Sequence, residues 1–133
     1  MLVKDVMIKD VITISPFAKL RDALAKMKKH QLKSLVVEKQ SDHDAYGLIT
    51  YTNILKTLVA EDGDIDLLNV YDVCAKPVVS VGESLAVKHL AALMIQNKAK
   101  RLAVLRDNEL VGLVTMNGIV DTLMTQIDST DKT

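Results

Sequence analysis

The chain carries the stretch Lys33–Val37 (KSLVV) a second time, sixty-seven residues later, as Lys100–Val104 (KRLAV). After a loop that is two residues shorter in the second copy, Gly47–Thr50 (GLIT) recurs as Gly112–Thr115 (GLVT). An internal repeat of this length sets the architecture before any local pattern is read. Each copy is too small to bury a full core by itself, so we expect the two copies to complete one another's core.

The same offset relates the beginnings of the two copies, because Asp5-Val6-Met7 recurs as Asp72-Val73-Cys74. We therefore predict that residues 1–133 form one domain, made of repeat 1 (residues 1–66), repeat 2 (residues 67–127) and a polar tail (residues 128–133). A polar terminal segment of this kind is expected to fray.

Composition limits the classes of partner. Hydrophobic residues make up 49% of the chain and charged residues 26%, which is ordinary for a soluble globular protein. Seventeen basic residues balance seventeen acidic ones, with ten of each sign in residues 1–66 and seven of each in residues 67–133. Nucleic-acid binding through phosphates usually requires a basic excess, so we expect no nucleic-acid partner. The short apolar runs, the absence of an opening signal peptide and the lone Cys74 favour a cytoplasmic protein without a membrane segment.

Local patterns predict a short helix and then a β-α-β-β-α order in each copy, a mixed α+β fold. In the first copy we expect strands near residues 11–14, 35–37 and 48–50, and helices over residues 19–31 and 51–61. The first of these helices has its apolar stripe at i, i+3, i+4 and i+7: Leu20, Ala23, Leu24 and Met27. The second has Ile54, Leu55, Leu58 and Val59.

The second copy predicts the same elements. Strands are expected near residues 78–81, 101–105 and 110–114, and the last two are joined by Asp107-Asn108, a tight-turn dipeptide. The closing helix shows a stripe of Ile119, Val120, Leu123 and Met124. The helix before these strands is apolar on every face between residues 90 and 95, because Leu93 and Ile95 replace the lysines of the first copy. We interpret Leu93 and Ile95 as part of a homodimer interface; the alternative is that the two cores differ in depth.

Two threonines stand where a strand passes into a helix. The hydroxyl of Thr50 lies beside unpaired backbone donors, a position that suits an anion or a hydroxyl-rich ligand. Asn53 lies three residues on, on the same side of the first helical turn. In the second copy Thr115 is followed at this spacing by Gly118, which has no side chain. The alternative to ligand binding is helix capping, for which threonine is a preferred residue.

The two copies, each with a Thr- or Ser-containing strand, a Lys-x-Leu-x-Val-like strand and a Gly-h-h-Thr turn into a helix, resemble a tandem pair of cystathionine-beta-synthase (CBS) domains. The resemblance covers residues 1–127. It implies two repeats packed sheet to sheet with pseudo-twofold symmetry, and clefts that hold AMP, ADP, ATP or S-adenosylmethionine. It also implies flat homodimers that regulate an enzyme or transporter.

The family's ligand signature is Gly-h-h-Thr/Ser-x-x-Asp, and this chain departs from it at Asn53 and Gly118. The resemblance therefore implies one adenosine-type site, chiefly in repeat 1. Its expected residues are Thr13, Ile14, Lys33, Ser34, Thr50 and Asn53. The matching positions of repeat 2 are Ser80, Val81, Lys100, Arg101 and Thr115.

No nucleotide-binding glycine loop, metal-ligand spacing or catalytic triad pattern is found in the sequence, and we expect neither an enzyme nor a required cofactor. The leading hypothesis is a stand-alone regulatory module that senses an adenosine-type effector and signals to an as yet unidentified partner protein. The alternative is a dimerisation or interaction scaffold that senses no ligand.

Overall fold

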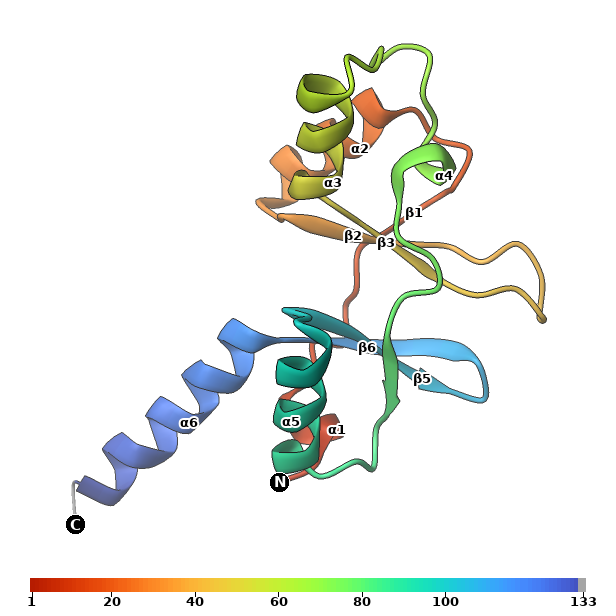
Figure 1. Ribbon diagram of the computed structural model, residues 1–133. Coiled ribbons are helices and arrows are strands. Elements are labelled where there is room, and N and C mark those ends of the chain that lie inside the picture. Colours follow the sequence, from red (N-terminus) through yellow and green to blue (C-terminus); the bar gives the residue numbers. More distant parts are fainter. Residues whose placement is uncertain (132–133) are drawn as a thin grey trace. The chain divides into compact units, whose positions relative to one another are not determined.

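The computed structural model describes residues 1–131, with side chains through residue 127, and both copies show the predicted order of elements (Figure 1). The first copy contains α1 (Val3–Val6), β1 (Thr13–Ile14), α2 (Leu20–His30), β2 (Ser34–Val37), β3 (Gly47–Thr50), α3 (Tyr51–Leu55) and the π-helix η1 (Lys56–Ala60). The second contains α4 (Val70–Val73), β4 (Ser80–Gly82), α5 (Val87–Asn97), β5 (Arg101–Arg106), β6 (Glu109–Thr115) and α6 (Met116–Asp131).

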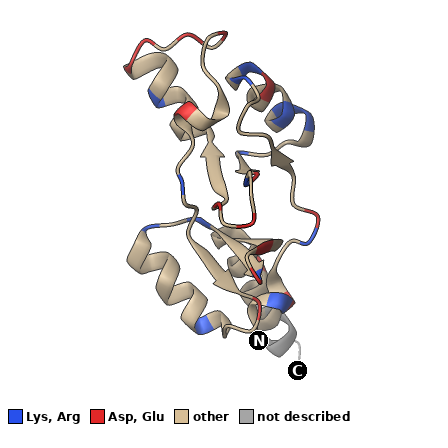
Figure 2. Cartoon of the chain, turned by 90° about the vertical axis from the view of Figure 1, so that its right-hand side faces the viewer, with Lys and Arg blue, Asp and Glu red and all other residues tan. Residues whose placement is uncertain are grey.

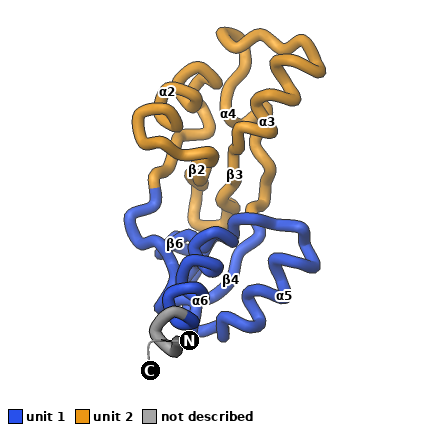
Figure 3. Tube along the Cα trace, turned by 90° about the vertical axis from the view of Figure 1, so that its left-hand side faces the viewer, with its two compact units in different colours: residues 1–11, 79–133 blue, residues 12–78 orange. Residues whose placement is uncertain are grey.

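The chain forms two compact units (Figure 3). Unit 1 contains residues 1–11 and 79–133, and unit 2 contains residues 12–78. Each unit has one three-stranded sheet, β1-β2-β3 in unit 2 and β4-β5-β6 in unit 1. In each sheet the first two strands are parallel and the last two antiparallel. The predicted mixed α+β class is therefore confirmed.

The two copies exchange their short first helices. In unit 1, Ile8 follows α1 and exchanges two backbone hydrogen bonds of 2.8 and 2.9 Å with Leu113 on β6. In unit 2, Ala75 follows α4 and exchanges the equivalent pair, both 2.9 Å, with Leu48 on β3. Val3 and Val70 are fully buried in the core of the unit that receives them. Each copy therefore fills the core of the other with one short helix.

The stripe predicted for α2 is confirmed in the core of unit 2. Leu20, Ala23 and Met27 are fully buried and belong to one cluster with Leu35 and Ile49 of the sheet. The ribbon shows α2 and α3 over the same face of this sheet (Figure 1). The fourth stripe residue, Leu24, is half-buried at the edge of this cluster.

The outer strands are shorter than the sequence predicts. Residues 11–14 were expected to be extended and paired, yet only Thr13 and Ile14 form β1. The chain passes from unit 1 to unit 2 between residues 11 and 12, so the preceding residues serve as a crossing segment. For residues 78–81 the strand begins later, at Ser80, because Val78 belongs to unit 2 and donates its N–H to the carbonyl of Tyr46 at 2.9 Å.

The last helix of each copy buries less of its stripe than the pattern suggests. Ile54 and Ile119 are buried, at 2% and 5% exposure. The next stripe residues are exposed: Leu55, Val59, Val120, Leu123 and Met124. Each stripe is therefore only partly covered, because periodicity identifies an apolar face but not what covers it. The predicted polar tail overlaps α6, which continues to Asp131; residues 132–133 lie outside the described residues.

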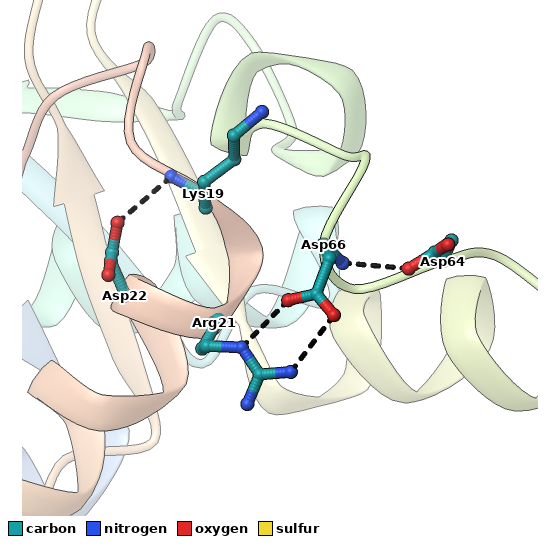
Figure 4. A network of polar contacts seen from close by, with 5 residues as sticks. All are labelled: Lys19, Arg21, Asp22, Asp64 and Asp66. Atoms are coloured by element: carbon teal, nitrogen blue, oxygen red, sulfur yellow. Dashed lines mark hydrogen bonds and ion pairs between the residues drawn. The ribbon is translucent and has the colours of Figure 1, made fainter.

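A charged contact ties α2 to the segment before α4 in unit 2 (Figure 4). Arg21 donates from Nε to Oδ1 of Asp66 at 2.8 Å and from Nη2 to Oδ2 at 3.2 Å. The hydrogen bond from Arg21 lowers the pKa of the Asp66 carboxyl. Both side chains are exposed, so the pair orients the connecting segment more than it stabilises the fold.

Truncating the exchanged helices tests their role in the core. We expect Val3→Ala and Val70→Ala each to lower the free energy of unfolding by roughly 2 kcal/mol, because each deletes two methyl groups from a closed site. Urea unfolding measures the change. Val59→Ala, on a side chain that is 69% exposed, is the matched control and should change stability by less than about 0.5 kcal/mol. Equal effects at all three positions would contradict the exchange as the source of the stability.

Candidate functional site

The strand-to-helix junction of repeat 1 is closed by a reciprocal pair of side chains. Thr50 is the N-cap of α3, and its Oγ1 accepts the backbone N–H of Asn53 at 3.1 Å. The Oδ1 of Asn53 accepts the backbone N–H of Thr50 at 3.1 Å and its hydroxyl at 3.0 Å. This capping box satisfies donors that a helix N-terminus otherwise leaves open. The capping interpretation of Thr50 is thus confirmed.

The same contacts fix the orientation of the Asn53 amide. A backbone N–H can only donate, so the atom of Asn53 that faces Thr50 is the oxygen. The amide nitrogen Nδ2 therefore points away from the cap, and it has no hydrogen-bond partner in the described part of the chain. An aspartate in this box would present a second acceptor oxygen here. Asn53 presents a donor, which reverses the polarity of the group offered to a ligand.

Two further predicted residues lie at this edge of the sheet. Ser34 pairs in register with Thr50 across β2 and β3 and is 7% exposed. The carbonyl of Lys33 accepts the N–H of Tyr51 at 3.0 Å, which holds the backbone of Lys33 against the first turn of α3. The side chain of Lys33 is exposed. The structure thus brings Lys33, Ser34, Thr50 and Asn53 together.

Thr13 and Ile14 lie on the other side of β2. Both lie on β1 and pair with Val36 and Val37 of β2. The strand β2 separates β1 from β3. The hydroxyl of Thr13 donates to Oε1 of Glu38 at 3.0 Å, and its carbonyl accepts from the ammonium of Lys26. Ile14 is buried in the core. The hydroxyl and carbonyl of Thr13 are therefore engaged within unit 2. Thr13 lies two strands across the sheet and two residues along it from Thr50, roughly 12 Å away.

The second copy keeps the backbone of this junction and loses the amide. Thr115 Oγ1 accepts the backbone N–H of Gly118 at 3.0 Å, and the backbone carbonyl of Lys100 accepts the N–H of Met116 at 2.9 Å. A Cβ at Gly118 would lie 3.0 Å from Thr115 Oγ1, a tight contact. Val81 is buried, whereas Ser80 and Lys100 are exposed and Arg101 is half-buried. The repeat 2 residues thus share one sheet, without a side chain at the position of Asn53.

The remaining polar candidates have structural surroundings. Burial raises the pKa of the Cys74 thiol, which opposes formation of a reactive thiolate. Asp44, in the hairpin loop between β2 and β3, pairs with Lys76 at 2.7 Å. Within residues 1–127, no group of three or more His, Cys, Asp or Glu side chains is placed to hold a metal ion.

Along the described chain no helix combines the length and apolarity needed to cross a bilayer. Acidic and basic residues are interspersed in both units (Figure 2).

The family model for the CBS domain matches the chain twice, at residues 3–60 and 70–125. The chain belongs to the CBS domain family. The two matches make it a CBS pair, as the sequence resemblance predicts, and CBS pairs are regulatory modules. The limits of the two matched ranges follow the two sequence repeats. The compact units differ from the repeats by the exchanged helices α1 and α4.

Known proteins support this assignment. An uncharacterized protein of Methanopyrus kandleri is 31% identical to the CBS pair over 113 residues, which are 84% of this chain and 57% of that protein. A hexameric CBS-CP12 protein from bloom-forming cyanobacteria is 32% identical with a TM-score of 0.84, over 90% of this chain and 66% of that one. The chain thus spans less than two thirds of either protein.

A third relative supports the fold. The CBS domain pair of protein MJ0100, whose crystal structure is a complex with 5′-methylthioadenosine and S-adenosyl-L-methionine, is 24% identical to this chain. Its TM-score is 0.82, over 95% of this chain and 98% of that one. At this identity the likeness concerns the fold of the CBS pair.

The two caps of the CBS pair should differ in strength. Thr115→Ala removes one hydrogen bond and should cost about 1 kcal/mol of unfolding free energy. Thr50→Ala also removes a partner of Asn53, so we expect a larger loss, about 1.5–2 kcal/mol, and a positive coupling with Asn53→Ala in a double-mutant cycle. Urea unfolding measures both, and Thr52→Ala, an exposed residue of the same turn, is the control. Additive effects of Thr50→Ala and Asn53→Ala would contradict the reciprocal cap.

Proposed function

We propose that this CBS pair is a regulatory module that binds an adenosine-type ligand at the repeat 1 site and passes its bound state to a partner protein. The ligand class is AMP, ADP, ATP or S-adenosylmethionine. The observation that carries the proposal is the Asn53 amide, which two hydrogen bonds hold in place. Its Nδ2 has no hydrogen-bond partner among the described residues and can donate to a ligand near the start of β2. A pre-oriented donor binds a ligand without the cost of ordering a mobile side chain.

The chemistry of this edge fits a ribose with an attached phosphate or carboxylate. Asn53 can donate to a ribose oxygen, and the exposed Lys33 can meet a negative charge. A neutral amide forms weaker hydrogen bonds than the carboxylate of the family signature. The complex with 5′-methylthioadenosine and S-adenosyl-L-methionine, described for the CBS pair of protein MJ0100, supports the ligand class. We therefore propose a ligand of this class that is bound more weakly than an aspartate would bind it.

Signalling requires a ligand that distinguishes two states of the module. A ligand changes the population of a conformation only by the difference between its affinities for the two conformations. The capping box joins the ligand position to the start of α3, so a ligand that competes for the Asn53 amide would act on the first turn of this helix. The exposed residues that follow, Leu55 and Val59, are available to a partner protein.

Thermal unfolding with a panel of adenosine compounds tests the ligand proposal. At a hundredfold excess over its dissociation constant, a ligand should stabilise the protein by about 2.7 kcal/mol. We expect Asn53→Ala to weaken binding by roughly tenfold and Asn53→Asp to strengthen it by a similar factor. Asn117→Ala, an exposed first-turn residue of α6, is the matched control and should leave binding unchanged. Indifference to every compound at millimolar concentration would refute the ligand proposal and favour the scaffold.

A scaffold role has support of its own in exposed apolar side chains of unit 1. Ile95 on α5 is 71% exposed, whereas Leu93 is half-buried and packs against the core. On α6, Val120, Leu123, Met124 and Ile127 are each 44–53% exposed at helical spacing. Residue spacing alone could have identified Ile127 as part of this stripe. We propose that a second copy of the chain covers these faces, forming a homodimer.

Light scattering tests the homodimer. We expect a mass of twice the 14.7 kDa of one chain, and a shift toward the single-chain mass in Ile95→Lys and in Leu123→Lys, because each buries an ammonium in the contact. Leu67→Lys, at a position that is 75% exposed outside both helices, should leave the mass unchanged. A dimer that survives Ile95→Lys but not Leu123→Lys would exclude α5 from the interface and retain α6.

A further inference from the structure

Unit 1 contains an open pocket of about 460 Å³ at the end of its sheet where β5 turns into β6. Because β5 runs from Arg101 to Arg106, this pocket lies about 17 Å along the strand from the Thr115 end of the sheet. It is therefore separate from the repeat 2 signature. Its lining residues are Lys4, Asp5, Met7, Lys9, Glu83, Arg106 and Val111.

The two carboxylates of the pocket already have partners inside unit 1. Glu83 accepts from Nε of Arg106 at one oxygen and from Nη2 at the other, 3.0 Å away. This contact lowers the pKa of Glu83. Asp5 accepts the backbone N–H of Leu2 at 2.8 Å, as the acidic member of the α1 cap. Both negative charges and the guanidinium are thus committed to holding the walls in place.

The two lysines of the pocket are not committed in this way. The ammonium groups of Lys4 and Lys9 form no hydrogen bond or ion pair with any described residue. The backbone N–H of Lys4 donates to the carbonyl of Glu83 at 2.9 Å, and its ammonium acts on the Glu83 carboxyl only as a nearby charge, which contributes to the lowered pKa of that carboxyl. Three basic side chains (Lys4, Lys9 and Arg106) and two acidic ones (Asp5 and Glu83) give the pocket a net charge of +1, which attracts an anion.

The second unit contains the same position as an internal comparison. Lys9 follows Ile8, which is bridged to Leu113, and Lys76 follows Ala75, which is bridged in the same way to Leu48. The two lysines therefore occupy equivalent backbone positions. In unit 2 the ammonium of Lys76 lies 2.7 Å from Oδ1 of Asp44. Lys76 and two backbone N–H groups hold the pKa of Asp44 at about 2.

The length of the hairpin explains why unit 1 has no such acid. In unit 2 the connection between β2 and β3 spans residues 38–46 and carries Asp44 back to Lys76. In unit 1 the connection is only Asp107-Asn108, a tight turn in which both residues have positive φ, 52° and 62°. This turn ends before it can return a carboxylate to Lys9. Unit 2 thus has an internal anion at the equivalent position, whereas the pocket of unit 1 is open.

We propose that the unit 1 pocket binds a small phosphate-bearing molecule through Lys4 and Lys9, where unit 2 uses the carboxylate of Asp44. Lysine is a compact point charge that suits phosphate, and the pocket has room for more than one phosphate group. The Arg106–Glu83 pair holds one wall of the pocket in place. This site does not depend on the repeat 1 signature, so it is a second ligand position in addition to the adenosine-type site.

Calorimetric titration with inorganic pyrophosphate at low salt tests the pocket. We expect binding to the full chain, and a dissociation constant at least about tenfold higher in Lys9→Gln and in Lys4→Gln, since each removes one charge-assisted contact. Lys76→Gln is the matched control from the equivalent position in unit 2, and Lys98→Gln, just before β5, is the control from the opposite end of the same sheet. Both should bind as the unchanged protein does. All four lysines are exposed, so the unfolding temperature should verify that every variant is folded.

Several results would overturn the proposal. Failure of the unchanged protein to bind millimolar pyrophosphate would do so, as would an equal loss in Lys76→Gln or Lys98→Gln, which indicates binding to surface charge in general. Equal affinity for malonate would replace phosphate recognition with a site for any dianion. Amide chemical shifts that move near Asn53 rather than near Lys9 and Val111 would assign the anion to the repeat 1 site. None of these results bears on adenosine binding, which the Asn53 variants report separately.

Discussion

The exchange of the short helices α1 and α4 is the constraint on which the rest of the structure depends. Each helix carries one fully buried valine into the other copy's core, and the second residue after the helix forms a two-bond bridge to an edge strand. Without this exchange each sheet would have an unpaired outer edge and an open core. The chain must therefore cross between the units twice, after residue 11 and after residue 78. Those crossings shorten β1 and β4, and they fix the equivalent positions of Lys9 and Lys76.

A second constraint acts at the opposite end of each sheet, where a strand passes directly into a helix. The first turn of such a helix has unpaired N–H groups, and a threonine hydroxyl accepts one of them in both copies. The recurrence of Thr50 and Thr115 is therefore explained by capping alone. What distinguishes the copies is the third residue after the threonine. Asn53 completes a reciprocal cap and retains a free donor, whereas Gly118 leaves only the backbone bond.

Most of the fold could be predicted because its signals are local. The stripe of α2 identifies its buried face, and Asp107-Asn108 predicts the tight turn whose positive φ values the structure shows. The helix exchange could not be predicted in this way, because bridges such as Ile8 to Leu113 join residues that are distant in the sequence. The exposure of apolar residues on the last helix of each copy could not be predicted from residue spacing either. Val120 and Met124 have the spacing of core residues, yet each is about half exposed in the described chain, at 49% and 51%.

The candidate site shows the same division. The residues near Thr50 follow from register, since a strand pair that places Ser34 opposite Thr50 must bring Lys33 and Asn53 to the same edge. The assignment of Thr13 to the ligand site stays a prediction, since its hydroxyl and carbonyl bind within unit 2. The hairpin-end pocket was missed, although the sequence carries its signal. Lys9 and Lys76 stand at the repeat offset, and only the longer hairpin of the first copy contains an acid, Asp44, that can return to the lysine.

The balanced total charge of the chain therefore hides an imbalance between equivalent positions. Each unit pairs an arginine with an acid across its loops, Arg21 with Asp66 and Arg106 with Glu83. At the hairpin end, however, unit 2 compensates its lysine internally and unit 1 does not. At the strand-to-helix junction the units differ in the opposite sense. Unit 2 has the oriented amide of Asn53, and unit 1 has Gly118 at the matching position. A duplicated backbone thus presents two chemically different surfaces, which we propose as sites for a ribose-like group and for an anion. Because a ligand shifts a conformational equilibrium only through differential affinity, two such sites would let two different ligands act on a module whose two halves share one fold.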